Sequence, residues 1–270
     1  MLKNIELQKN VITVESLAMF RPNQKTLDRL GGFYADASEA ISKLLGSITS
    51  SNAAVGVDGR EFLPLIKDAD YTTLTSLQLT FPKELSTDYA TALQVMTDVA
   101  VVPESLYRDV LEPFAKWLAI TLNNPKAMES VNQFVSIDVN RAKNAREQLA
   151  KVTRGNGSES VRYSRAVRRN SDWEKVISQV NRIAANNANV KIDDIRTKIK
   201  EIDDMLQILI GKLNEPRFEY RPTGAFVDRL VNLTYAMAAE VEFYAEFEFL
   251  FGKVLSAVRD DVTFLTKKLK

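Results

Sequence analysis

Closely spaced acidic side chains in the carboxyl-terminal third of the chain are the first candidates for chemistry. Aspartates stand in pairs at 193–194, 203–204 and 260–261, and paired carboxylates can bind Mg²⁺ or transfer protons. Neighbouring residues on a helix point about 100° apart, so a single pair does not converge on one ligand. All three pairs also fall outside the inward positions of the heptads described below. We therefore interpret them as solvated helix surface.

Four glutamates lie close together in the sequence between residues 240 and 248, as the ligands of a carboxylate metal centre can: Glu240, Glu242, Glu246 and Glu248. Di-iron sites in helical bundles combine such glutamates with Glu-x-x-His pairs, and this chain contains no histidine. Only Glu248 occupies an inward heptad position. A buried glutamate needs a cationic partner or a proton. We therefore expect Glu248 to specify helix register or partner choice rather than to bind a metal.

The absence of histidine and cysteine removes most of the familiar catalytic machinery. It excludes a Ser-His-Asp triad, a cysteine nucleophile, and zinc or iron sites built on imidazole or thiolate. The glycines at 155 and 157 lack the lysine and the spacing of a phosphate-binding loop. We expect no metal, no cofactor and no enzymatic activity. An enzyme that uses Asp, Glu, Lys, Arg or Tyr is the remaining alternative in this class.

The segment 153–170 combines helix-breaking glycines and serines with four arginines, Arg162, Arg165, Arg168 and Arg169. This composition is typical of a solvated linker. The alternative is a phosphate or nucleic-acid contact, in which the arginines bind phosphates and Tyr163 stacks on a base. Four arginines spread over a segment of this length are a weak signal for such a contact, so the linker is the preferred interpretation.

Residues 243–251 are apolar on nearly every side of a helix. Four of them lie off the inward face, namely Phe243, Phe247, Phe249 and Leu250. A helix that is apolar all round must be covered on more than one side. Either the rest of the chain covers this face, or a second subunit does, since subunit interfaces are rich in aromatic residues. An interface predicts that truncation of Phe247 and Phe249 weakens association more than folding.

The elements that carry these residues are predicted by a spacing of three and four between apolar side chains over most of the chain. The clearest heptads run from Trp173 to Leu213 and from Val227 to Leu269. A connection with two prolines at 214–222 separates them, and Thr223 can cap the second helix. The equal lengths of the two arms predict a long antiparallel hairpin that resembles a coiled coil.

One irregularity leaves two interpretations of the first arm. The heptads of 171–213 contain a four-residue insertion near Asn186, Asn187 and Asn189. It is either a stutter in one continuous helix or a turn between two helices. The matching lengths of the two arms favour the continuous helix.

The amino-terminal half is predicted to be helical as well, with helices at 25–48, 86–101, 104–122 and 127–152. Ser86 is the expected N-cap of the second helix, and Pro113 is expected to kink the third. Apolar and polar residues alternate at 74–81, which favours a small β patch that the arm at 5–7 can join.

The expected fold is therefore mainly α: an elongated helical bundle with a small β patch and a long carboxyl-terminal hairpin. We place an amino-terminal, mostly helical lobe at 1–152, the linker at 153–170 and the hairpin at 171–270. A chain of 270 residues with 45% hydrophobic and 26% charged residues can bury a core of its own.

Charge and hydropathy set the expected environment. The net charge is +1, but residues 1–135 carry 12 basic and 16 acidic side chains, whereas residues 136–270 carry 24 and 19. Neither half has the basic excess of a dedicated nucleic-acid binder. No uncharged apolar run is long enough to span a bilayer, and the first residues contain no apolar signal region. We expect a soluble intracellular protein.

The expected function is that of a non-enzymatic structural or assembly protein, a subunit of a larger symmetric complex that binds protein partners or further copies of itself. Long helical heptads, excess aromatic residues and the absence of a convergent polar site favour this class. A virus or tailed-phage particle is the preferred setting, which would place the chain in the virion. The alternative is an adaptor that binds nucleic acid or an anionic membrane surface through the basic carboxyl-terminal half.

The purified protein is expected to contain no stoichiometric transition metal, because imidazole and thiolate ligands are absent. Elemental analysis of the protein as isolated checks this expectation. Iron or zinc close to one atom per chain would contradict our interpretation of the carboxylates.

Overall fold

The computed structural model describes residues 55–130, 140–153, 160–188, 192–215 and 223–270, and part of a helix before them: Gly32, Tyr34, Ala35, Ser38, Glu39 and Ser42. The described chain is mainly helical, with one small antiparallel sheet and a long carboxyl-terminal helix, which confirms the mainly α prediction, whereas the coiled-coil-like hairpin is not confirmed. It divides into two compact units. Unit 1 comprises residues 1–48, 106–140 and 193–241, and unit 2 comprises residues 49–105, 141–192 and 242–270.

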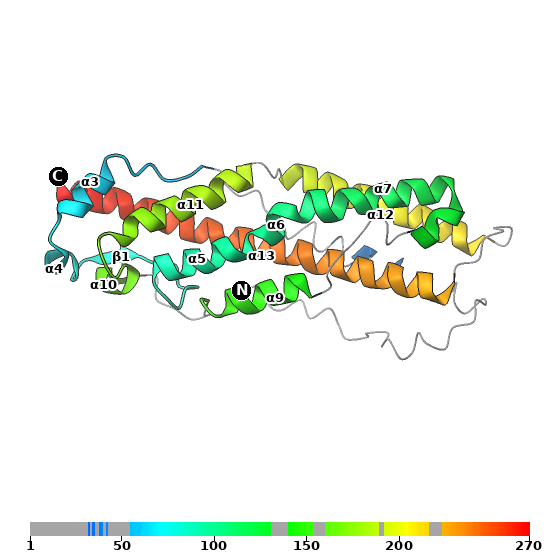
Figure 1. The fold of residues 1–270 in the computed structure, drawn as a ribbon, viewed down its shortest axis with the longest axis horizontal. Coiled ribbons are helices and arrows are strands. Elements are labelled where there is room, and N and C mark those ends of the chain that lie inside the picture. The colour runs from blue at the N-terminus through cyan, green and yellow to red at the C-terminus, as the bar shows by residue number, and fades with distance from the viewer. Residues whose placement is uncertain are drawn as a thin grey trace. The chain divides into compact units, whose positions relative to one another are not determined.

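Unit 2 contains most of the short elements. They are α3 (Phe62–Asp68), α4 (Tyr71–Leu74), β1 (Gln78–Thr80), α5 (Tyr89–Val99), α6 (Val101–Ser105), α9 (Arg141–Ala150), β2 (Ser160–Arg162), α10 (Tyr163–Ala166) and α11 (Asp172–Ala188). The second half of α13 (Gly224–Leu269) completes the unit. Helix α5 packs against both α11 and α9 (Figure 1).

Helix α5 begins three residues later than the sequence predicts. Asp88 is its N-cap, and the Asp88 carboxylate accepts a hydrogen bond from the amide of Thr91 at 2.9 Å. Ser86, the predicted cap, instead donates its amide to the carbonyl of Val152. Aspartate and serine are about equally good caps, so this tertiary bond decides which residue takes the role.

The predicted strand at 74–81 is confirmed at β1, but its partner strand lies in the predicted linker. Strand β2 pairs antiparallel with β1, with Gln78 opposite Arg162 and Thr80 opposite Ser160. The apolar residues of 160–170 are buried and its arginines are exposed. Residues 160–170 are therefore not a solvated linker, whereas the predicted domain boundaries stay a prediction. The arm at 5–7 lies outside the described residues.

Aromatic side chains form the core of unit 2 around Trp173. The rings of Phe62 and Trp173 meet edge to face with centroids 5.2 Å apart, and those of Tyr89 and Trp173 are 6.0 Å apart. Phe81 lies against the other side of this group, 4.9 Å from Tyr89. Each such pair contributes about 0.5–1.5 kcal/mol beyond the apolar area it buries.

Unit 1 contains a π-helix, η1 (Leu106–Leu111), followed by α7 (Glu112–Asn123), the 3₁₀ helix η2 (Pro125–Ser130), α12 (Ile192–Asn214) and the first half of α13. Pro113 has no amide hydrogen, so it cannot continue an α-helical ladder. The chain takes the wider π turn before it and starts α7 with Pro113 in the first turn. At the position of the predicted kink, the structure has a change of helix type.

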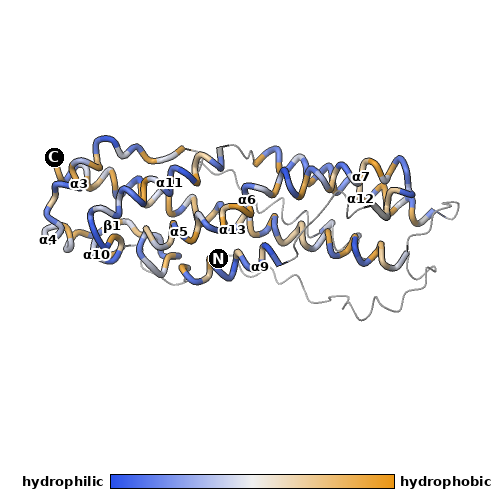
Figure 2. The backbone as a smooth tube through the Cα atoms, viewed as in Figure 1, coloured by the Kyte–Doolittle hydropathy of each residue, from blue (hydrophilic) through white to orange (hydrophobic). Residues whose placement is uncertain are grey.

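Phe114 and Trp117 stack in the core of unit 1 with centroids 5.7 Å apart, and Phe226 of α13 lies 6.0 Å from Trp117. The Lys212 ammonium of α12 donates to the carbonyl of Leu122 at 2.9 Å. A cation at the end of α7 stabilises the partial negative charge of that terminus. Along the helices of each unit, hydrophobic and hydrophilic residues alternate with the helical turns (Figure 2).

The first arm of the predicted hairpin contains helices α11 and α12. Helix α11 ends at Ala188 and α12 begins at Ile192, while 189–191 lie outside the described residues. Asn186 and Asn187 are helical, as the last turn of α11, and Asn189 is one of the residues outside the description. The preference for a continuous helix over a turn therefore stays a prediction.

The second arm is confirmed at both ends. Helix α13 spans Gly224–Leu269, as predicted, and the Thr223 hydroxyl accepts a hydrogen bond from the amide of Phe226 at 3.2 Å. Of the other predicted helices, 127–152 is replaced by the 3₁₀ turn η2 and by α9, with 131–139 outside the described residues. All described residues of the predicted helix at 25–48 are helical.

We expect Gly56→Ala to destabilise the fold by about 1–3 kcal/mol, the cost of a lost buried hydrogen bond. A Cβ at Gly56 would lie 2.2 Å from Oδ1 of Asn181, and this amide binds both the N–H and the C=O of Val57. Gly211→Ala is the matched control, since nothing lies within 4 Å of its Cβ position in α12. It should stabilise the protein by up to about 1 kcal/mol. Urea unfolding of both variants measures this difference, and equal effects would contradict the account.

Candidate functional site

Three of the four candidate interface residues are buried inside the chain itself. Phe243, Phe247 and Leu250 are buried, whereas Phe249 keeps 47% of its surface exposed. The ring of Phe247 lies between those of Phe243 and Phe251, at centroid distances of 6.2 and 6.4 Å. Side chains covered in a single chain do not face a second subunit. These three residues are therefore part of the core of this chain. Of the four candidates, Phe249 alone can still contact a second subunit.

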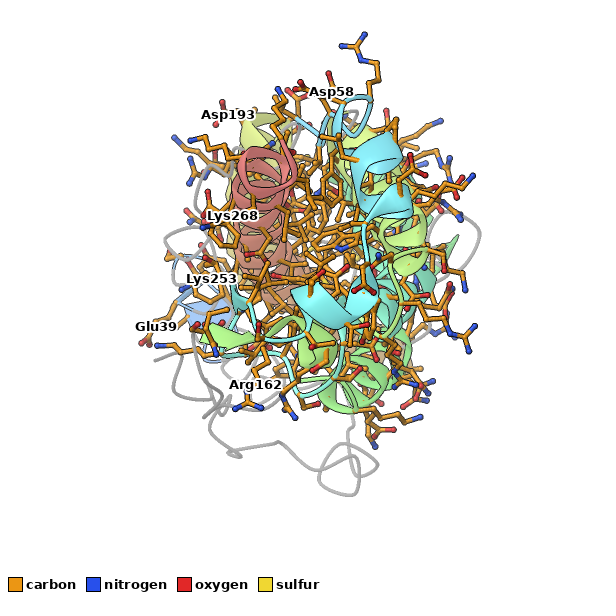
Figure 3. The ribbon with its side chains drawn as sticks, turned by 90° about the vertical axis from the view of Figure 1, so that its left-hand side faces the viewer. Glu39, Asp58, Arg162, Asp193, Lys253 and Lys268 are labelled. Atoms are coloured by element: carbon orange, nitrogen blue, oxygen red, sulfur yellow. The ribbon has the colours of Figure 1, made fainter. Side chains whose placement is uncertain are left out.

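Phe249 lies on the surface of α13 beside a basic residue. The Lys253 ammonium is 5.4 Å from the centre of the Phe249 ring and also 3.6 Å from the carboxylate of Glu84. Lys253 points outward from the ribbon (Figure 3). A cation over an exposed ring contributes about 0.5–1 kcal/mol, and it leaves part of the ring free for contact.

Two of the four glutamates bind an arginine rather than a metal. Arg146 of α9 pairs with Glu242 at 2.7 Å and with Glu246 at 2.8 Å. Burial acts to lower the pKa of Arg146, but the two glutamates outweigh it and the net pKa is raised. This triad ties α9 to α13 by charge-assisted bonds.

The other two glutamates, Glu240 and Glu248, are both buried. The predicted heptad register placed only Glu248 on the inward face. Because Glu240 is buried as well, the register was wrong at this position. Burial raises the pKa of the Tyr244 hydroxyl, and the electrostatic effect of Glu248 adds to the rise. The role of Glu248 in specifying register or partner choice stays a prediction.

The four candidate phosphate-binding arginines are exposed at β2, α10 and the turn that follows. Arg168 pairs with Asp88 at 2.9 Å, and Arg162 points away from the ribbon (Figure 3). Tyr163, the proposed stacking residue, is buried instead. Its hydroxyl donates to Oδ1 of Asn170 at 2.8 Å and accepts from Nε1 of Trp173 at 3.1 Å. A ring held in this way cannot stack on a base.

The aspartate pairs differ from the sequence interpretation at two positions, Asp203 and Asp261. Asp193, Asp194, Asp204 and Asp260 are exposed, as expected. Asp203 is partly buried, and burial raises the pKa of its carboxyl. Asp261 is only 1% exposed. A carboxylate that leaves water completely needs hydrogen bonds or a proton, so Asp261 is the residue whose chemistry needs explanation.

Asp261 lies at a junction of three elements of unit 2. Its Oδ1 accepts a hydrogen bond from the amide of Thr80 in β1 at 2.6 Å, and its Oδ2 is 2.8 Å from the hydroxyl of Tyr89 in α5. The same hydroxyl is 2.6 Å from the carbonyl oxygen of Thr80. We refer to Asp261, Tyr89 and Thr80 as the junction cluster.

Burial dominates the electrostatics of the junction cluster. It raises the pKa of Asp261 to about 7, although hydrogen bonds from Tyr89 and Thr80 to the ionised form oppose the rise. Burial also raises the pKa of the Tyr89 hydroxyl well above its usual range, and the nearby Asp261 charge adds to this effect. Both side chains are closed to solvent, so the cluster can hold a proton near neutral pH but cannot reach a substrate.

Within the described ranges, no three acidic side chains are grouped in a way that could hold a metal ion. None of the described helices has the length and apolarity needed to cross a membrane. The junction cluster is therefore the candidate site with the most unusual chemistry in this part of the chain.

Phe247→Ala is expected to destabilise the protein by about 3–5 kcal/mol, because it empties a core position. Phe249→Ala, two residues away, should change stability by about 0.5 kcal/mol or less, as is usual for an exposed position. Urea unfolding of the two single variants measures the contrast. If Phe247→Ala left stability unchanged and instead altered the molar mass in solution, the core interpretation would be wrong.

Comparison with known proteins assigns no family to this arrangement. No protein-family model matches the chain, and neither the curated proteins nor the solved structures give a match.

Proposed function

We propose that this chain is a non-enzymatic structural or assembly protein that works as a subunit of a larger complex. The observation that carries the proposal is that the polar groups of the junction cluster bind one another. The Asp261 and Tyr89 side chains bind each other and the backbone of Thr80 across β1, α5 and α13, and both of these side chains are buried. A catalytic acid or base must reach the proton that it transfers, and this pair does not.

Other polar groups of unit 2 are used in the same way. The Arg146 triad joins α9 to α13, and Tyr163 and Asn170 join α10 to the residue after α3 through the carbonyl of Ala69. Polar groups used in this way rigidify a scaffold. Such a scaffold acts through its surface, which supports an assembly role over an enzymatic one.

The surface offers one aromatic contact point that this proposal uses. Phe249 is exposed on α13, and aromatic residues are enriched where proteins bind one another. A coiled-coil-like antiparallel pairing of α12 with the first half of α13 belongs to the same proposal. The virus or tailed-phage particle stays its preferred setting.

A second candidate function is an adaptor for nucleic acid or an anionic membrane surface. It is favoured by the exposure of Arg162, Arg165 and Arg169 on β2, α10 and the turn after α10. Phosphate binding through these side chains would weaken steeply with salt. Binding to a DNA duplex or to anionic vesicles that is lost in Arg162→Ala/Arg165→Ala would favour the adaptor over the assembly subunit.

Light scattering on the full chain tests the proposal. We expect a molar mass that is a multiple of 30.4 kDa or a defined complex with a co-purified protein. Phe249→Ala should weaken that association about 30-fold, since truncating an aromatic contact at an interface costs about 2 kcal/mol. Ser256→Ala, an exposed change on the same helix, should have no effect. A monomer at all concentrations that binds no protein would contradict the proposal.

A further inference from the structure

The backbone of Thr80 presents a free edge that the junction cluster covers. The amide of Tyr163 donates to the carbonyl of Leu77, which makes these two residues a hydrogen-bonded pair of the antiparallel ladder. Such pairs alternate along a strand. With Thr80 opposite Ser160, the N–H and C=O of Thr80 therefore point away from β2. Asp261 binds the first of these groups and Tyr89 binds the second.

The number of protons in the cluster decides the state of Asp261. The Tyr89 hydroxyl has a single proton and lies 2.6 Å from the Thr80 carbonyl and 2.8 Å from Oδ2 of Asp261. A carbonyl oxygen can only accept. If Tyr89 donates to Thr80, the contact with Oδ2 is a hydrogen bond only when Oδ2 carries a proton and donates to the Tyr89 oxygen.

A neutral carboxyl group satisfies all three contacts at once. Its carbonyl oxygen, Oδ1, accepts from the Thr80 amide, and its hydroxyl, Oδ2, donates to Tyr89, which in turn donates to the Thr80 carbonyl. An ionised Asp261 would compete with that carbonyl for the one Tyr89 proton. Two oxygen atoms 2.6 Å apart with no proton between them repel each other, so the Thr80 carbonyl would lose its partner.

We propose that Asp261 is a proton-operated latch: its protonated carboxyl holds β1 and α5 on α13, and loss of the proton releases the free edge of β1. The inference is independent of the assembly proposal. It concerns how firmly β1 is attached to α13 in the folded chain at a given pH.

The charged groups near Asp261 either favour its protonated form or are bound by other partners. Asp260, the preceding residue of α13, disfavours a second negative charge, and Tyr89 of α5 lies in direct contact. Strand β1 contributes backbone groups only. At the start of α5, Asp88 is bound by Thr91 and Arg168, and Glu84 of the intervening loop pairs with Lys253. None of these interactions brings a cation to Asp261.

The direction of the pH effect follows from the pKa of Asp261, raised from 3.8 to about 7. The folded state holds the proton more tightly than the unfolded state, so the stabilisation is complete below pH 4 and is lost as the pH rises through 7. Over that interval the unfolding equilibrium constant of the wild type increases by up to about tenfold per pH unit from this group alone.

The variant Asp261→Asn distinguishes a proton-dependent role of Asp261 from a purely structural one. An amide matches the neutral carboxyl, because its oxygen accepts from Thr80 and its N–H donates to Tyr89. Urea unfolding between pH 5 and 8 should show the wild type losing stability relative to Asp261→Asn as the pH rises, with no further change well above 7. Asp260→Asn, the matched change at the exposed neighbour, should still lose stability as the pH rises, by a somewhat smaller amount because the Asp260 charge no longer raises the pKa of Asp261. Parallel curves for the wild type and Asp261→Asn would overturn the proposal.

A measurement on the wild type keeps the proposal testable if the variant does not fold. In protein labelled with ¹³C at aspartate carboxyl carbons, the resonance of Asp261 should titrate near pH 7. An aspartate carboxyl in an unstructured peptide, the reference for this measurement, titrates near about 4. An Asp261 resonance that is fully ionised at pH 6 would overturn the proposal, whatever the variant does.

Discussion

Attachment to the carboxyl-terminal half of α13 is the constraint on which the rest of unit 2 depends. Elements such as α4, with four residues, and β1 and β2, with three each, are too short to be stable alone. Polar contacts bind surrounding segments to this half of the helix. Asp261 binds β1 and α5, the Arg146 triad binds α9, and Arg259 donates to the carbonyl of Val55. The helix thus acts as a common support for segments that are far apart in the sequence.

These attachments differ in energetic weight. The pairs of Lys253 with Glu84 and of Lys270 with Glu61 are partly exposed, and each such pair contributes about 0–1 kcal/mol. The Asp261 and Tyr89 side chains and the rings of Phe243, Phe247 and Phe251 are buried, where the loss of one partner is costly. The geometry of the unit is therefore set mainly by what the helix buries.

How much could be predicted from the sequence depended on how local the signal was. The bounds of α13 were predicted at both ends, because an unbroken 3–4 spacing and a threonine cap are local features. Strand β1 was predicted for the same reason. Strand β2 was missed, because its three residues, Ser160–Arg162, pair with a segment about eighty residues earlier and resemble a basic loop in isolation.

The candidate site was missed for a different reason. The heptad register assigns one inward face to a helix, and it placed Asp261, Glu240, Phe243 and Phe247 outside that face. Helix α13 is buried on more than one side, so positions off the seam are buried as well. The aromatic run at 243–251 signalled this multi-sided burial, and the same signal, extended along the helix, points to the acidic residues.

The amide of Thr80 gives the most direct test that α13 fixes β1 through Asp261. Native-state hydrogen exchange at pH 5.5 measures the free energy needed to expose that amide. Our account predicts that Thr80 exchanges only with the global opening that also exposes the amides around Val258 in α13, despite its place on the free edge of a three-residue strand. Exchange of Thr80 through local fraying, at a much lower free energy than these helix amides, would contradict it.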